Sequence, residues 1–387
     1  MLRYLWPTLA TDTIAAGRVD YAVNLDHVQP EAGILKSIST VMEDVMRGKP
    51  LECSMQWSEE DRTRMLRAIE LAECGRGKVS PNPLVGCVIV KDGKIVAEGW
   101  HDHLGGLHAE QMAIHDAEQK GIATKDCTAY VTLEPCNHFG RTPPCTESLL
   151  WAGISKVIIA QEDLNPNVRG EGISVLEAAN ITVEKGLLKE EAAAQMRYFL
   201  HWCKHRRPFV TIKVAVDANG SVDDLAEDSQ RFTSQECLVK VHELRRDCDA
   251  ILVGVNTVIR DDPSLTVRHV DCEKQPLRLV IDPNSRIPGD AILLNDSNRT
   301  MLLQSGFNGL QRLLEMLGDM EVQHLLVEGG PATIAHFLEQ DMVDEFLLIQ
   351  SDVVHKQPVL ADFDLSKLTR FENMVWGKEN VHCWKRG

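Results

Sequence analysis

Apolar residues after residue 57 recur first at helical spacing and then in strand-like runs. The first helical stripe consists of Met65, Leu66, Ile69 and Ala72. Ser58 and Asp61 stand before it at the spacing of an N-terminal capping box. The continuous apolar run 84–90 predicts a strand buried on both faces, and Asp92-Gly93 predicts a hairpin turn into a strand over 94–98.

This alternation continues and predicts a layered α/β domain over 58–203. The further helices expected in it are 108–120, 144–151 and 188–203. Strands are expected over 127–133 and 156–160, and the apolar segments 173–179 and 181–185 complete the domain. The basic run 204–208 ends in a proline and predicts a short connection rather than a long linker.

A second α/β unit is predicted over 209–387. Its expected strands are 209–216, 250–255, 277–281 and 324–327, and its expected helices are 234–247 and one that opens at Gly330. Residues 1–57 carry no recognisable chemistry. We expect an unassigned, non-catalytic extension there, with one short amphipathic helix over 34–46.

Composition narrows the class of protein. A chain of 387 residues is long for a single hydrophobic core, which favours two domains. The formal charge of −16 argues against broad binding to nucleic acid or an anionic membrane, but leaves room for a phosphorylated small substrate. The eleven cysteines are scattered, and no apolar run approaches the ~20 residues that cross a bilayer. We expect a soluble cytoplasmic protein; homo-oligomer formation stays open.

One histidine and two cysteines form the strongest chemical pattern. His108, Cys136 and Cys145 offer the donors of a catalytic Zn²⁺ site, in which a fourth position is left for water. Zinc lowers the pKa of that water to roughly 7. Glu110 stands beside the first donor, free to carry protons, and His-x-Glu followed by Pro-Cys and a second Cys is typical of zinc deaminases. A structural zinc site or a pair of buried thiols is the alternative, although neither would need Glu110.

The helix that begins near His108 sets a geometric condition. Two residues along an ideal helix turn by about 200°. His108 and Glu110 therefore face one site only if His108 lies at the helix entry, which Gly105-Gly106 just before it permits.

Eight residues separate Cys136 from Cys145, whereas the general deaminase pattern has two. The insert Asn-His-Phe-Gly-Arg-Thr-Pro-Pro resembles the deaminase half of the bifunctional deaminase/reductase family of riboflavin biosynthesis. The resemblance implies a cytidine-deaminase-like three-layer α/β/α fold for 58–203 and a substrate contact by Asn82. It also implies hydrolysis, with Glu110 moving protons, of the 2-amino group of 2,5-diamino-6-ribosylamino-4(3H)-pyrimidinone 5′-phosphate.

The second unit contains a weaker pattern. Glu328-Gly329-Gly330 leads from a strand into a helix, where free amides and the helix dipole favour an anion. Its neighbours 210–215, 228–230, 251–257 and 261–268 follow in the order of the reductase half of the same family, which this unit therefore resembles. The resemblance implies a dihydrofolate-reductase-like fold and NADPH-dependent reduction to 5-amino-6-ribitylaminouracil 5′-phosphate.

The resemblance also assigns residues in the second unit. It implies NADPH contacts by Ala215, Arg231, Thr257, Asp261, Gly330, Pro331, Ala332, Thr333, Ile334, Ala335 and His336. It implies substrate contacts by Ser229, Arg245, Leu265, Arg268 and Glu328. The two arginines suit a phosphate monoester, which guanidinium groups bind by paired hydrogen bonds. A surface ion pair for Arg245 and a simple turn at 261–263 are the alternatives.

Several positions depart from the resembled family. Asp217-Ala-Asn219-Gly-Ser221 stands where the family usually has Ser-Leu-Asp-Gly followed by Lys or Arg. Arg231 stands in place of a tryptophan and Pro283 in place of a serine. We therefore expect a reductase half that works poorly. The alternatives are a deaminase-only protein with a degenerate nucleotide-binding domain, another zinc nucleobase deaminase, and a zinc-stabilised fold without catalysis.

Overall fold

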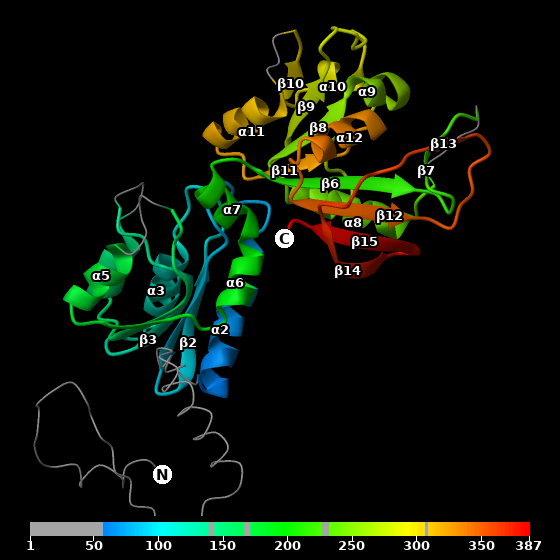
Figure 1. Cartoon of the computed structure of the whole chain (residues 1–387). Coiled ribbons are helices and arrows are strands. Elements are labelled where there is room, and N and C mark those ends of the chain that lie inside the picture. The colour runs from blue at the N-terminus through cyan, green and yellow to red at the C-terminus, as the bar shows by residue number, and fades with distance from the viewer. Residues whose placement is uncertain (1–56, 139–142, 166–170, 227–231, 306–308) are drawn as a thin grey trace, which may run out of the picture. The chain divides into compact units, whose positions relative to one another are not determined.

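The computed structural model describes residues 57–138, 143–165, 171–226, 232–305 and 309–387. Residues 57–387 form one compact unit (Figure 1). The helix predicted over 34–46 lies outside the described residues. Among the residues that are described, there is no helix of the length and apolarity that crossing a membrane requires.

The first half is built on a five-stranded sheet with the order β2-β1-β3-β4-β5. Its strands are β1 (Gly86–Lys91), β2 (Lys94–Trp100), β3 (Thr128–Leu133), β4 (Lys156–Gln161) and β5 (Thr182–Lys185). Strand β1 runs antiparallel to β2 and β3, while β3, β4 and β5 are parallel. The helices are α2 (Glu59–Ala72), the short 3₁₀ helix η2 (Glu73–Gly75), α3 (Ala109–Gln119), α4 (Cys145–Trp151), α5 (Glu171–Ala178), α6 (Lys189–Gln195) and α7 (Arg197–His205).

Helices cover both faces of this sheet and bury a core on each. On one face, α3, α4 and α5 contribute Ala113, Leu149 and Leu176. On the other face, α2 and α7 contribute Met65 and Phe199. The predicted three-layer α/β/α arrangement is therefore confirmed.

Local sequence explains where the first elements begin. The Ser58 hydroxyl accepts from the Asp61 amide at 3.0 Å, and the Asp61 carboxylate accepts from the Ser58 amide at 3.2 Å, which forms the predicted capping box. Asp92 and Gly93 have φ of 48° and 78°, the left-handed backbone that a tight hairpin turn requires. The predicted stripe is wrong at Leu66, which is 46% exposed, because α2 turns other side chains toward the sheet.

The single helix predicted over 188–203 is also wrong. Two helices, α6 and α7, replace it, with a break at Met196, whose φ is −104° and ψ 25°. No glycine or proline marks this break in the sequence. Met196 is buried in the core with Phe199, so packing rather than local propensity sets the break.

The second half contains an eight-stranded sheet with the order β10-β9-β8-β11-β6-β12-β15-β14 and a two-stranded ribbon of β13 and β7. The strands are β6 (Phe209–Val216), β7 (Ser221–Asp224), β8 (Ala250–Gly254), β9 (Leu277–Ile281), β10 (Thr300–Leu303), β11 (His324–Val327), β12 (Glu345–Gln350), β13 (Pro358–Leu360), β14 (Thr369–Trp376) and β15 (Glu379–Lys385). The helices are α8 (Gln235–Arg246), α9 (Val255–Asp261), α10 (Ile292–Asn295), α11 (Leu310–Asp319) and α12 (Pro331–Glu339).

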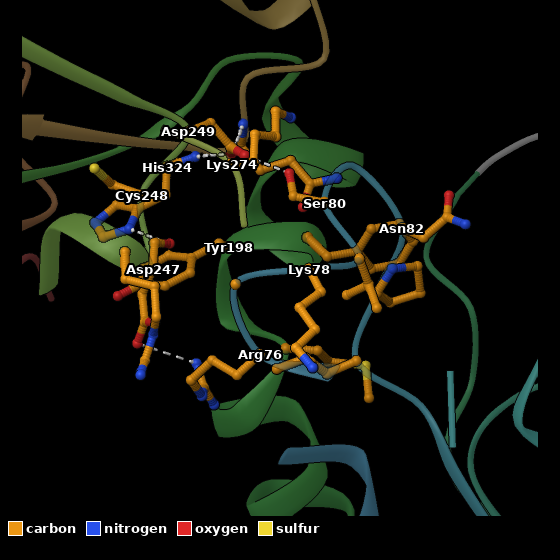
Figure 2. Close-up of a pocket in the computed structure, with 18 of the residues that line it drawn as sticks. Arg76, Lys78, Ser80, Asn82, Tyr198, Asp247, Cys248, Asp249, Lys274 and His324 are labelled. Atoms are coloured by element: carbon orange, nitrogen blue, oxygen red, sulfur yellow. Dashed lines mark hydrogen bonds and ion pairs between the residues drawn. The ribbon is translucent and has the colours of Figure 1, made fainter. Parts of the chain in front are cut away.

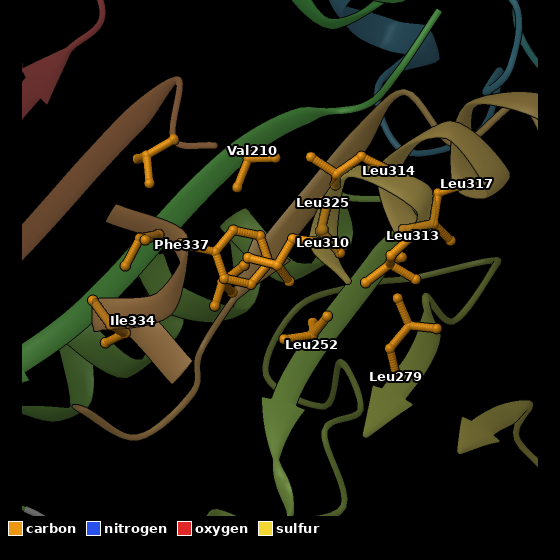
Figure 3. Close-up of a cluster of buried hydrophobic side chains, with 14 of the residues drawn as sticks. Val210, Leu252, Leu279, Leu310, Leu313, Leu314, Leu317, Leu325, Ile334 and Phe337 are labelled. Carbon is orange, nitrogen blue, oxygen red and sulfur yellow. The ribbon is translucent and has the colours of Figure 1, made fainter. Parts of the chain in front are cut away.

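The first six strands in this order, from the edge strand β10 through to β12, pair in parallel. Strand β15 pairs antiparallel with both β12 and β14. Figure 3 shows leucines of α11 packed over the inner strands. They are Leu310, Leu313, Leu314 and Leu317, which meet Val210, Leu252, Leu279 and Leu325. The sequence interpretation missed α11, although its apolar residues recur at helical spacing and could have predicted it.

The connection between the two halves is short. Helix α7 ends at His205 and β6 begins at Phe209. The indole nitrogen of Trp202 donates to the Gly318 carbonyl at 2.9 Å. A Cβ at Gly318 would lie 2.0 Å from the Arg206 carbonyl oxygen, so this close approach needs glycine. The domain limits 58–203 and 209–387 stay predictions.

Candidate active sites

The three predicted zinc donors converge in the first half. His108 is the N-cap residue of α3, with an extended backbone (φ −72°, ψ 162°), so it lies at the helix entry as the geometric argument required. Its Nδ1 lies 3.2 Å from Cys145 Sγ and 3.5 Å from Cys136 Sγ. All three donor atoms lie within 4.8 Å of one another.

This donor set fits a tetrahedral zinc ion. Zinc–nitrogen and zinc–sulfur bonds at tetrahedral angles place nitrogen and sulfur roughly 3.5 Å apart, close to the distances found. The pKa of Cys136 is lowered to about 4, first by the hydrogen bond from Cys145 and then by His108, whereas the same hydrogen bond and burial raise the pKa of Cys145. One proton thus serves two thiols, and a divalent cation in its place would meet two thiolates.

Glu110 lies in the first turn of α3 and is only 3% exposed. Burial, and after it the negative charge of Cys136, raises the pKa of its carboxyl group. A hydrogen bond joins Glu110 to Cys145, so its carboxyl group lies at the edge of the donor set. A buried carboxyl group with a raised pKa is a stronger base than an exposed one, which suits it to take up and pass on a proton.

A cavity of about 570 Å³ opens beside these groups and also contains Asn82 and His101. The Leu107 carbonyl is 2.9 Å from His101 Nδ1, which must therefore donate. His101 Nε2 then accepts from the Asn82 side-chain amide at 3.0 Å. This chain of hydrogen bonds fixes the orientation of the Asn82 amide, whose oxygen stays available to a ligand.

Contacts with α5 and with the backbone of Asp163 support the loop that carries Cys136. The Glu134 carboxylate accepts from the amides of Asp163 at 3.1 Å and Ile173 at 3.3 Å. A Cβ at Gly172, on α5, would lie 2.0 Å from the Pro135 carbonyl oxygen. Asp163 lines the cavity as well, and burial raises its pKa to about 6. The sequence interpretation missed Asp163; no motif marks it.

Two of the predicted substrate residues of the second half, Arg245 and Glu328, contact each other, and Glu328 directly follows β11. Its carboxylate accepts from Arg245 at 2.6 and 2.9 Å and pairs with Lys213 at 2.8 Å. Burial opposes ionisation, but Arg245 and Lys213 outweigh it, so the pKa of Glu328 is well below its usual value. The alternative of a surface ion pair for Arg245 is therefore wrong, and Lys213 is a member of this cluster that the sequence interpretation missed.

Arg268 is held differently, by the hydroxyls of Ser264 and Thr266 rather than by a carboxylate. Three side chains fix the loop that presents it. The buried His242 accepts from the Arg268 amide at 3.0 Å, and the buried Arg278 donates to the Ser264 carbonyl at 2.8 Å. The half-buried Gln275 bonds both the amide and the carbonyl of Val267. The loop thus offers a cation in a defined place, which suits an anionic ligand.

The glycines at the ends of β8 and β11 bring the predicted cofactor residues together. Gly330 caps α12, and a Cβ there would stand 3.4 Å from the Thr257 hydroxyl. A Cβ at Gly254 would stand 2.5 Å from the Thr333 hydroxyl. Pro331 has no N–H and the Thr333 amide donates to the Gly330 carbonyl, so these two hydroxyls and the positive end of the α12 dipole form the small polar surface that fits a pyrophosphate.

Other predicted residues of the second half fit this surface less well. Leu265 (φ 50°) and Ile334 are buried in the apolar core, so only their backbones can meet a ligand. Pro331, Ala332 and His336 are exposed on α12, Asp261 is exposed at the end of α9, and Ala215 and Ala335 are partly buried. Ser229 and Arg231 lie outside the described residues.

The segment that departs from the resembled family has a structural role of its own. The buried Asp217 carboxylate accepts from the amides of Asn219, Ser221 and His355 at 2.7 to 2.9 Å, and these amides outweigh burial and lower its pKa. The Ser221 hydroxyl is buried and bonds Asp223 and Val359. Ser221 therefore does not replace the missing cation.

Two protein families match the two halves of the chain. Residues 58–161 match the cytidine and deoxycytidylate deaminase zinc-binding region, and residues 208–354 match the RibD C-terminal domain. The fold and sites thus define a zinc deaminase joined to a reductase.

The riboflavin biosynthesis protein RibD of Aquifex aeolicus is 41% identical over 311 residues, which cover 75% of this chain and 86% of that protein. The structure of Acinetobacter baumannii RibD is similar with a TM-score of 0.79 at 32% identity, covering 85% of this chain and 99% of that one. A diaminohydroxyphosphoribosylaminopyrimidine deaminase/5-amino-6-(5-phosphoribosylamino)uracil reductase from Thermotoga maritima gives 0.78 at 33%, with the same coverages.

The chain belongs to the RibD family of bifunctional deaminase/reductases of riboflavin biosynthesis, whose cofactors are zinc and NADPH.

Proposed function

We propose that the first half removes the 2-amino group of 2,5-diamino-6-ribosylamino-4(3H)-pyrimidinone 5′-phosphate by hydrolysis. The observation that carries this proposal is the convergence of the donors His108, Cys136 and Cys145 beside a cavity that His108, Cys136 and the buried Glu110 line. When bound by the three donors, zinc supplies a Lewis acid that makes water nucleophilic at neutral pH.

The side chains of the cavity divide the remaining work. Glu110, with its raised pKa, takes one proton from the attacking water and delivers it to the ring nitrogen. It then takes the second proton, from the hydroxyl now bonded to the ring carbon, and delivers it to the amine, which leaves as ammonia as the ring carbonyl forms. The Asn82 carbonyl oxygen, oriented through His101, accepts a hydrogen bond from the substrate. The buried Asp163 is a second acceptor on the cavity wall.

We propose that the second half reduces the ribosyl side chain with NADPH. The Thr257 and Thr333 hydroxyls at the positive end of α12 support binding of the cofactor pyrophosphate. Arg245 and Arg268 would anchor the substrate phosphate. The protein orients the two partners and the cofactor supplies the hydride. Because Ser221 lies buried where the family has a cation, we expect this step to be the slower one.

The test is mass spectrometry of the products from this pyrimidine, with and without NADPH. Deaminated product without NADPH, and ribityl product only with it, would support both activities. Deaminated product alone in both reactions would support the deaminase-only alternative. Absence of any deamination by zinc-loaded protein would overturn the main proposal. Cytoplasmic location and assembly state stay predictions.

A further inference from the structure

The turn 80–82, which carries the deaminase residue Asn82, is bound by side chains of the reductase half. The Ser80 hydroxyl donates to the Asp249 carboxylate, and the Gln323 side-chain amide donates to the Pro81 carbonyl. Figure 2 shows Ser80 beside Asp249, with Asn82 farther along the same turn. Two consecutive residues before Asn82 are thus tied to the other half of the chain.

These two contacts have a common and rigid origin. Asp249 directly precedes β8, and Gln323 directly precedes β11, the strand that pairs with it. The second oxygen of Asp249 accepts from the amides of Gln323 at 2.8 Å and His324 at 3.0 Å. Gln323 is only 5% exposed, and the carboxylate that binds Ser80 also fixes the backbone of Gln323. The turn is therefore held by two residues that directly precede paired strands of the reductase sheet.

The same region forms part of the deaminase cavity. Pro81 and Asn82 line that cavity, and so does Glu321, two residues before Gln323. Asn82 is fixed on its other side by His101. Displacement of Asn82 would weaken its hydrogen bond to the substrate, and a hydrogen bond of this kind typically contributes about 0.5–1.5 kcal/mol.

We propose that Asp249 and Gln323 are positioning residues of the deaminase site: they hold the turn 80–82 so that the Asn82 carbonyl oxygen faces the cavity. This inference rests on the proposed deaminase function. It follows that the affinity of the deaminase site for its substrate depends on the reductase half as a structural part, independently of how fast that half transfers hydride.

The experiment measures ammonia release by the zinc-loaded full chain carrying Gln323→Ala or Gln323→Glu. Both changes remove the donor to Pro81, and the glutamate keeps the size of the side chain. Loss of one hydrogen bond predicts a KM increase of about threefold to tenfold, with kcat and zinc content unchanged. Asp249→Ala should act in the same direction, while Asp249→Asn, which still offers an acceptor to the two amides, should recover part of the affinity.

Glu345→Gln is the matched control. It weakens the pair between Glu345 and Arg197, whose atoms lie 3.1 Å apart, and so loosens another contact between the halves without touching the turn. We expect its KM to equal that of the wild type. An equal KM increase in this variant would mean that general docking, not the turn, is responsible, and would overturn the inference.

A double-mutant cycle separates positioning from a general effect on the fold. In an Asn82→Ala background, Gln323→Ala should raise KM no further, because its effect passes through Asn82. Additive effects would contradict the proposal. Wild-type protein without ammonia release would refute the proposed function itself, whereas active wild type with an unchanged Gln323→Ala variant would refute only this inference.

Discussion

The zinc site and the reductase site are built from the same kind of α/β framework but differ in how their residues are gathered. His108, Cys136 and Cys145 come from two short motifs and place their donors within 4.8 Å of one another. The reductase residues come from separate strands and loops: Arg245 and Lys213 pair with Glu328, whereas Arg268 is held by a loop of its own. A site with three metal donors tolerates little change, whereas a dispersed site can lose one member and keep its other contacts.

The departures at 217–221 illustrate this difference. Asp217 organises its own turn, and Ser221 is bonded to the neighbouring ribbon, so the altered segment is well formed although it lacks the family cation. The cluster of Glu328, Arg245 and Lys213 remains complete beside it. The local structure of this segment therefore does not require the family cation.

Cys136→Ser should have the largest effect. Loss of one of three donors should lower the zinc content from one per chain toward zero, and ammonia release should fall to background. Elemental analysis and an ammonia assay measure the two effects. Cys127→Ser, a buried thiol outside the donor set, is the control and should keep its zinc. Full zinc occupancy in the Cys136 variant would contradict the ligand assignment.

Glu110→Gln should keep the zinc but slow deamination by about 10²–10⁴-fold, because it removes proton transfer without removing a donor. Single-turnover ammonia release from protein of measured zinc content tests this. A near-normal rate would show that another group, such as Asp163, carries the proton.

The reductase half should turn over more slowly than the deaminase half by roughly 10- to 100-fold, since one lost charge-assisted hydrogen bond costs about 1.5–3 kcal/mol. NADPH oxidation and ammonia release, followed in the same reaction, give the two rates. Equal rates would mean that the departures at Ser221 and Pro283 do not slow the reductase half. The two sites would then differ in how their residues are gathered but not in rate.

The smallest expected effect concerns stability at mildly acidic pH. Burial lowers the pKa of His324 to about 3, so the folded state keeps it neutral while the unfolded chain binds a proton below about pH 6.5. Stability is then complete above that pH and falls as the pH drops toward 3. His324→Gln should reduce this slope by up to about 1.4 kcal/mol per pH unit, measured by denaturant unfolding between pH 6.5 and 4. Identical slopes would refute the assignment.

Features set by neighbouring residues were predictable from the sequence. The capping box at Ser58, the Asp92-Gly93 turn and the placement of His108 at a helix entry depend on local chemistry, and the structure agrees with each. The exposure of Leu66 and the break at Met196 were not predictable, because packing partners distant in the chain decide them.

The same distinction applies to the sites. The zinc donors could be predicted because a metal imposes residue types and spacing. The supports of Arg268, namely His242, Gln275 and Arg278, act through the backbone of a loop and follow no motif. The bond from Gln323 to Pro81 joins residues far apart in the sequence, and only the folded chain brings them together.

Gly172 has a consequence for divergence within the family. A side chain there would collide with the Pro135 carbonyl, one residue before Cys136, although α5 supplies no metal donor. A relative that still binds zinc must keep glycine at this position, whereas a relative that has lost the metal can carry a larger residue there. The residue at position 172 should therefore distinguish relatives that retain a working metal loop from those that keep only the fold.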